Sequence, residues 1–203
     1  IDRWDNPQFH QIHEMLSSHV EYLQMSVYDL DPAQIGRFDI VLFMGVLYHL
    51  KHPLLALERV ASVANDFVAV ESFVLRERHR PGIGIEQLPV MEFYEGEDFG
   101  GQFDNWIAPT VPCLLALCRT AGFARVVLNN VHEYGAAIRC ERTWPLLRTQ
   151  RRPGLTLLSV FHTDTRGLNF QSLSSDDYVA CRLTAEGIDL SAETVWPEVG
   201  GYG

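Results

Sequence analysis

The segment FDIVLFMGVLYHL, residues 38–50, decides the fold class of this chain. Residues 38–48 are almost all apolar and predict a strand buried on both faces of a parallel sheet. The segment ends in Met44, Gly45, Tyr48 and His49 instead of an ordinary turn. In open α/β sheets, ligands bind beyond the carboxyl ends of the strands. The segment therefore predicts a parallel sheet with a ligand site around Tyr48 and His49.

The flanking sequence alternates between helix and strand patterns. Apolar spacing predicts helices over residues 7–18, 54–63 and 110–120, strands over 20–28 and 67–74, and a closing antiparallel pair over 125–130 and 136–141. Asp29 and Asp31 end the apolar segment that precedes the central strand, so we expect polar groups from two strand ends at one edge of the sheet. The polar, glycine-rich stretch 76–101 is too long for an ordinary connection. We expect a lid or substrate loop there.

The sequence changes character after residue 150. Arg151-Arg152-Pro153-Gly154 reads as a linker, and two strand-like segments follow, at 155–162 and 177–183, without a helical period between them. These features predict one domain over residues 1–150 and part of a β-rich module over 151–203. Both ends of the chain are expected to be cut through domains.

The composition of the chain narrows the classes of partner and the compartment that we expect. The formal net charge is −10, and no run of Lys or Arg suggests a nucleic-acid footprint. The four cysteines lack CxxC spacing, which favours reduced, buried thiols. No apolar run approaches the roughly 20 residues that span a membrane. We therefore expect a cytoplasmic protein.

Residues 1–141 resemble the class I S-adenosylmethionine-dependent methyltransferases, in particular the group that includes the bacterial tRNA wobble-uridine carboxymethyltransferase. The most specific match is MGVLYH at 44–49, followed by Pro53. Weaker matches are Ile1-Asp2, FD at 38–39, NW at 105–106 and AGF at 121–123. The resemblance implies a Rossmann-like α/β sheet, here without its first strand and helix, with S-adenosylmethionine as the cofactor.

The resemblance also implies a cofactor site, residue by residue. Asp2 would accept hydrogen bonds from the ribose hydroxyls, or alternatively cap the helix after it. Tyr28 and Asp29 would contact adenine, although Asp29 also suits an ordinary turn before Pro32. Met44, Gly45 and Tyr48 would line the methionine and sulfonium end; a methionine on a buried strand is also ordinary core.

Candidate catalytic and substrate residues surround this cofactor site. Tyr48 and His49 are the catalytic candidates, because histidine titrates near neutrality, although a strand-end histidine often only bonds a carbonyl. His49 and His52 lack a third ligand at a compatible spacing, so we expect no metal. Glu71, Asn105 and Trp106 are candidates for substrate contact, with a core-anchor role as the alternative for Trp106.

Together these features predict methyl transfer to a small-molecule acceptor such as a sugar or other secondary metabolite. In the resembling carboxymethyl-transferring enzymes, an arginine holds the extra carboxylate of the cofactor, and Gly135 stands nearest to that position here. Ordinary S-adenosylmethionine is therefore expected. The alternatives are tRNA wobble-uridine modification, a non-catalytic scaffold module and, least favoured, a Rossmann dehydrogenase. We also expect the isolated chain to be marginally stable or to self-associate, because a sheet without its first strand exposes an apolar flank.

Overall fold

The computed structural model describes residues 7–142, 155–162 and 178–185. Along the chain, the α-helices are α1 (Pro7–Met15), α2 (Pro32–Ile35), α3 (Pro53–Val63) and α4 (Val111–Thr120), and the 3₁₀ helices are η1 (Val27–Asp29), η2 (Leu47–His49), η3 (Glu77–His79) and η4 (Ile85–Gln87). The strands are β1 (Glu21–Gln24), β2 (Phe38–Met44), β3 (Ala64–Ser72), β4 (Met91–Phe93), β5 (Ile107–Pro109), β6 (Arg125–Val131), β7 (Ala136–Glu141), β8 (Leu155–His162) and β9 (Tyr178–Ala185).

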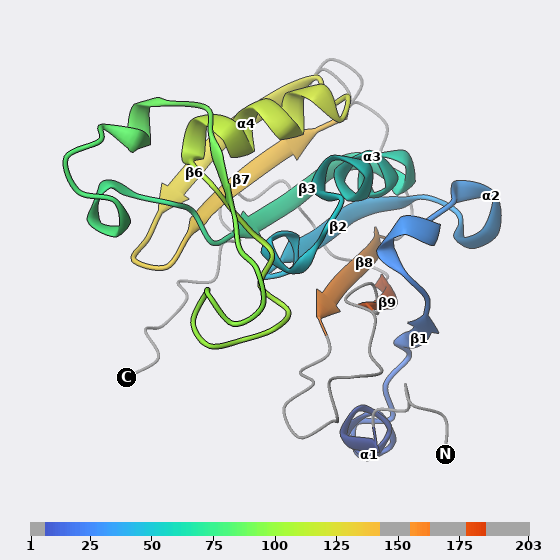
Figure 1. Ribbon diagram of the computed structural model, residues 1–203. Coiled ribbons are helices and arrows are strands. Elements are labelled where there is room, and N and C mark those ends of the chain that lie inside the picture. The colour runs from blue at the N-terminus through green and yellow to red at the C-terminus, as the bar shows by residue number, and fades with distance from the viewer. Residues whose placement is uncertain (1–6, 143–154, 163–177, 186–203) are drawn as a thin grey trace.

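Among the described residues, seven strands form one mixed sheet in the order β1-β9-β8-β2-β3-β7-β6. The apolar strand β2 lies at its centre and pairs in parallel with β3 on one side and with β8 on the other. Strands β6 and β7 form the expected antiparallel pair, and β7 runs antiparallel to β3. Helices α3 and α4 lie side by side against one face of the sheet (Figure 1). This arrangement confirms the predicted α/β class.

Strand β2 is central because its side chains are apolar on both faces. Phe38, Val41 and Phe43 are fully buried. Helix α3 covers one face of the sheet with Leu57 and Val60, which are also fully buried and repeat at helical spacing. The predicted strand over 38–48 ends four residues early, because Gly45 turns the backbone and residues 47–49 form η2.

The strand predicted over residues 20–28 is shorter than expected. Only Glu21–Gln24 is extended, and it pairs with β9 at the edge of the sheet. The chain then turns into η1, because the Ser26 side chain caps this helix by accepting the amide hydrogen of Tyr28 at 3.3 Å. Strand β1 still runs in the same direction as β2, because β9 is antiparallel to both β1 and β8. Its carboxyl end therefore faces the same edge of the sheet.

Strands β8 and β9 join this sheet. Four register pairs, Ile40 with Leu157 through Phe43 with Val160, place β8 beside β2. Asp39 and Thr156 stabilise the first residues of this pairing, because the Asp39 carboxylate accepts hydrogen bonds from both the amide and the hydroxyl of Thr156 at 3.0 Å. The flank of β2 that we expected to be exposed is thus covered by β8. The linker at residues 151–154 lies outside the described residues, so the division at residue 150 stays a prediction, as does self-association.

The loop 76–101 contains short elements that contact β5 and α4. Strand β4 pairs with β5, and Leu75 and Tyr94 are buried beneath them. Glu77 organises one part of the loop by accepting the amide hydrogens of Ile83, Gly84 and Ile85, and these bonds lower the pKa of its carboxyl. Whether the loop moves as a lid stays a prediction.

Thr110 connects this loop to α4 through the hydrogen bonds of its side-chain hydroxyl. The fully buried side chain accepts amide hydrogens from Cys113 at 3.4 Å and Val90 at 3.3 Å, and donates to the Leu88 carbonyl. We expect Thr110→Val to lower the free energy of unfolding by about 1–2 kcal/mol, because it removes a helix cap and leaves buried polar groups unpaired. Urea unfolding tests this, with exposed Thr120→Val as the control. Equal changes in both variants would contradict it.

The structure also bears on the cysteines and on membrane-spanning helices. Cys113, Cys118 and Cys140 are free thiols, whereas the Cys181 side chain lies outside the described residues. Within the described segments, no helix is both long and apolar enough to cross a bilayer.

Candidate functional site

Gly45 forms the turn at the carboxyl end of β2. Its φ of +72° lies in the left-handed region, which favours glycine. Its amide donates to the Glu71 carbonyl at 3.1 Å, and a β-carbon built on it would lie 3.9 Å from Glu71 Oε2. The turn therefore brings the end of β2 against the end of β3. We call the group Gly45, Tyr48, His49 and Glu71 the strand-end site.

Tyr48 stands in η2, directly after this turn. Its carbonyl accepts the amide hydrogen of Trp106 at 2.9 Å, so the backbone of η2 is tied to the segment before β5. Burial raises the pKa of the Tyr48 hydroxyl, and the nearby charges of Glu71 and Asp104 raise it further. Tyr48 is thus a neutral phenol at neutral pH and keeps a proton to donate.

His49 is the buried member of the strand-end site, with 8% of its surface exposed. Its Nδ1 lies 2.9 Å from the Asp104 carbonyl oxygen and 3.9 Å from Asp104 Oδ2. Because a carbonyl only accepts, Nδ1 carries the proton in this bond. Burial lowers the pKa of His49, and the Asp104 carbonyl and carboxylate oppose that effect in part. A neutral imidazole with a fixed tautomer results.

Glu71 is the penultimate residue of β3 and lies against His132 at the sheet edge. Its Oε1 lies 3.4 Å from Nε2 of His132, which belongs to the turn between β6 and β7. Burial raises the pKa of the Glu71 carboxyl, while His132 and the Gly45 amide act in the opposite direction. Gly135 allows this turn to approach, because a β-carbon there would lie 2.5 Å from the Ser72 carbonyl oxygen and 2.7 Å from Glu71 Oε1.

Asn105 and Trp106 hold the preceding loop in place. Asn105 is buried, and its Nδ2 donates to the Phe99 carbonyl at 3.1 Å and to Gln102 Oε1 at 2.9 Å. The Trp106 carbonyl accepts from the Tyr94 amide at 2.9 Å, and Lys51 Nζ lies 4.4 Å from the centre of the indole ring. Within the described residues, Asn105 Oδ1 and Trp106 Nε1 are buried without a hydrogen-bond partner. Both side chains are therefore anchored beside η2, and their role in substrate contact stays a prediction.

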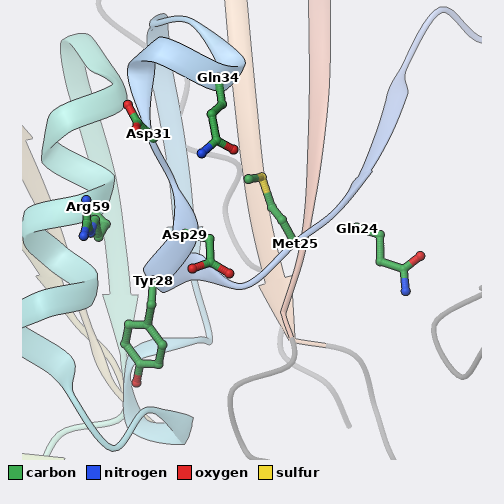
Figure 2. Close-up of a pocket in the computed structure, with 7 residues that line it drawn as sticks. All are labelled: Gln24, Met25, Tyr28, Asp29, Asp31, Gln34 and Arg59. Carbon is green, nitrogen blue, oxygen red and sulfur yellow. The ribbon is translucent and has the colours of Figure 1, made fainter.

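Tyr28 and Asp29 line a separate open pocket of about 510 Å³ (Figure 2). Its other lining residues are Gln24, Met25, Asp31, Gln34 and Arg59. The Tyr28 hydroxyl accepts the amide hydrogen of His52 at 3.1 Å, and the two rings meet edge to face at 5.9 Å. His52 follows η2 by three residues and caps α3. This contact links the pocket to the loop that leaves the strand-end site.

Met44 and Asp2 are the remaining predicted cofactor residues. Met44 is half-buried at the end of β2 and is paired in register with Glu71. Asp2 lies outside the described residues. The described segments contain no group of three or more His, Cys, Asp or Glu side chains arranged to hold a metal ion.

Two residues of the site were missed from sequence, namely Asp104 and His132. Both lie in connections, where no apolar period marks a direction for the side chain. A weak signal existed for His132, because the turn of a predicted antiparallel pair beside β3 must pass near the end of that strand. Their distances from His49 and Glu71 follow only from the packed sheet.

Comparisons with known proteins place the fold. No family model matches this sequence, and no curated protein matches it. Among solved structures, the Burkholderia thailandensis 1,6-didemethyltoxoflavin-N1-methyltransferase, with 1,6-didemethyltoxoflavin and S-adenosylhomocysteine bound, is similar at a TM-score of 0.51 and 19% identity, over 68% of this chain and 58% of that one. EvdMO1 is similar at a TM-score of 0.45 and 21% identity, over 65% of this chain and 28% of that one. The chain thus spans less than two thirds of these neighbours, and the likeness to the toxoflavin enzyme shows a shared Rossmann-like α/β fold.

Proposed function

We propose that this chain is part of an S-adenosylmethionine-dependent methyltransferase that acts on a small-molecule acceptor. The observation that carries the proposal is the strand-end site, where Gly45, Tyr48 and Glu71 meet at the carboxyl ends of two parallel strands. Ligands bind at this edge of open α/β sheets. The shared fold with a methyltransferase, and the resemblance of residues 44–49 to that class, support the same assignment.

The residues fit S-adenosylmethionine as two connected parts. Tyr28 and Asp29 would hold adenine in the open pocket, where the carboxylate accepts from the exocyclic amine. Met44, Gly45 and Tyr48 would line the methionine and sulfonium end. At the left-handed Gly45 turn, the nearest atom that the described part of the chain brings to the position of a β-carbon, its own chain neighbours aside, is Glu71 Oε2 at 3.9 Å, which leaves room for a ligand. Asp2 is proposed for the ribose. When bound, this cofactor supplies an already activated methyl group.

The protein then has to orient the acceptor and exclude water. We assign Tyr48 and His49 to the reacting centre, because Tyr48 keeps a donatable proton and His49 is a neutral base with a fixed tautomer. Glu71 is proposed to contact the substrate. Asn105 and Trp106 would shape the acceptor side by holding the loop 76–101 against η2.

The acceptor is proposed to be a small molecule, such as a sugar or another secondary metabolite. The acidic net charge disfavours a tRNA acceptor. Gly135 disfavours the carboxymethyl cofactor, because even a β-carbon at this position would lie 2.5 Å from the Ser72 carbonyl oxygen, leaving no room for an arginine side chain. The 1,6-didemethyltoxoflavin bound by the similar Burkholderia enzyme is a small molecule of this kind. A salt-dependent affinity for tRNA would favour the wobble-uridine alternative instead.

Isothermal titration with S-adenosylmethionine and S-adenosylhomocysteine tests the proposal. It should be carried out on this chain and on a version extended upstream of residue 1. Asp29→Ala is expected to weaken both ligands about tenfold, because it removes a charge-assisted hydrogen bond to the exocyclic amine, worth about 1.4 kcal/mol. Glu14→Ala, an exposed carboxylate on α1, is the matched control. Absence of binding by either form would reject the cofactor and favour the scaffold alternative.

A further inference from the structure

Glu71 is a carboxylate whose two oxygens face different parts of the strand-end site. Glu71 is the penultimate residue of β3, and its side chain is 21% exposed. Oε1 lies 3.4 Å from Nε2 of His132, and Oε2 lies 3.9 Å from the position of a β-carbon on Gly45. The carboxylate is thus held between the β6–β7 turn and the turn that leaves β2. The second of these turns is proposed above for the sulfonium end of the cofactor.

Within the described residues, His132 is the basic side chain that lies within ion-pair distance of Glu71. His132 faces it from the β6–β7 turn, and Tyr48 faces it from η2 as a neutral phenol that is also within the field of Asp104. Burial raises the pKa of the Glu71 carboxyl, and only His132 and the Gly45 amide counter this effect. A cation at the Gly45 turn would therefore stabilise the ionised carboxylate.

We propose that Glu71 is the counter-charge for the sulfonium of bound S-adenosylmethionine. This inference rests on the proposed function. In the transfer, the methyl carbon would bond to the acceptor and its bond to sulfur would break with the electron pair left on sulfur, so the product S-adenosylhomocysteine would carry no sulfonium charge. Glu71 would then attract the substrate form of the cofactor and not the product form. The same carboxylate would favour exchange of spent cofactor for fresh cofactor.

The test is the ratio of two dissociation constants, measured by isothermal titration of S-adenosylmethionine and S-adenosylhomocysteine into whichever form of the protein binds them. Glu71→Gln is expected to weaken S-adenosylmethionine about tenfold at pH 8 and to change S-adenosylhomocysteine by less than about twofold. In the unaltered protein, the preference for S-adenosylmethionine should decline as the pH falls and Glu71 is protonated. In Glu71→Gln the ratio should not vary with pH.

Matched variants separate charge from shape. Glu71→Asp keeps the charge and should restore part of the preference. His132→Gln keeps the carboxylate and should leave the ratio at pH 8 within about threefold. If Glu71→Gln fails to fold, the pH dependence of the unaltered protein decides the question alone. An unchanged ratio in Glu71→Gln, or a pH-independent ratio in the unaltered protein, would overturn the inference while leaving the cofactor site intact. Absence of binding of both ligands by the unaltered protein would instead overturn the proposed function and this inference with it.

Discussion

Leu158→Ala is expected to lower the free energy of unfolding by about 3 kcal/mol, the typical effect of removing a buried leucine side chain. Leu158 is fully buried and pairs in register with Val41 on the central strand. It packs in the same core cluster as residues of β2, β3 and α3. The lost packing should therefore destabilise the whole sheet in one cooperative transition, which urea unfolding followed by circular dichroism would record.

Leu157→Ala is the matched control for this prediction. Leu157 neighbours Leu158 on β8, is half-buried and points to the opposite face of the sheet. Its truncation should reduce the free energy of unfolding by about 1 kcal/mol, because less apolar area is lost. A separate C-terminal module would behave differently. Two transitions, with Leu158→Ala shifting only one of them, would contradict the single sheet and favour a domain boundary near residue 150.

Gly135→Ala is expected to destabilise the protein by about 2 kcal/mol, within the range for overpacking. The added β-carbon would meet the Ser72 carbonyl oxygen at 2.5 Å and Glu71 Oε1 at 2.7 Å. The backbone oxygen cannot yield by rotation, so the β6–β7 turn must move away from β3. The contact between Glu71 and His132 should loosen as a result.

Gly82→Ala provides the comparison. Gly82 has a φ of +80° and open space around it, so an alanine there is disfavoured by its backbone conformation alone, by about 1 kcal/mol. Thermal unfolding of both variants would rank them. A Gly135→Ala protein as stable as the unaltered one would show that the turn is free to shift, and the close approach to Ser72 would then have no energetic significance.

Much of this fold could be predicted from the sequence, because the spacing of apolar residues along a segment reflects how that segment packs. The apolar run of β2 is typical of a strand buried on both faces, and the spacing of Leu57 and Val60 is typical of a helix packed on one face. The end of the strand at residues 20–28 was predicted wrongly, because the Ser26 cap starts η1 within an alternating pattern. The place of β8 beside β2 could not be predicted, because strand pairing across a long separation leaves no local trace.

The candidate site likewise contains residues that the sequence predicted and residues that it did not. Gly45, Tyr48 and Glu71 were expected near each other, because each follows or ends a parallel strand of the predicted sheet. Their electrostatic partners Asp104 and His132 belong to connections, whose paths depend on packing and on the room left by Gly135. The bonds of Asn105 to Phe99 and Gln102 were equally invisible in the sequence, and they bind this side chain to its own loop.

The pairing of β8 with β2 has a consequence for how the chain reaches its native state. Asp39 and Thr156, which start the pairing, are 117 residues apart. Sheets closed by contacts this distant in sequence fold slowly, because the entropy of a long loop is lost before the pairing is gained. During synthesis, one edge of the central strand must therefore stay unpaired until residues 155–162 have been made. In that interval the nascent chain presents an apolar strand edge, and we expect it to depend on chaperones more than the finished protein does.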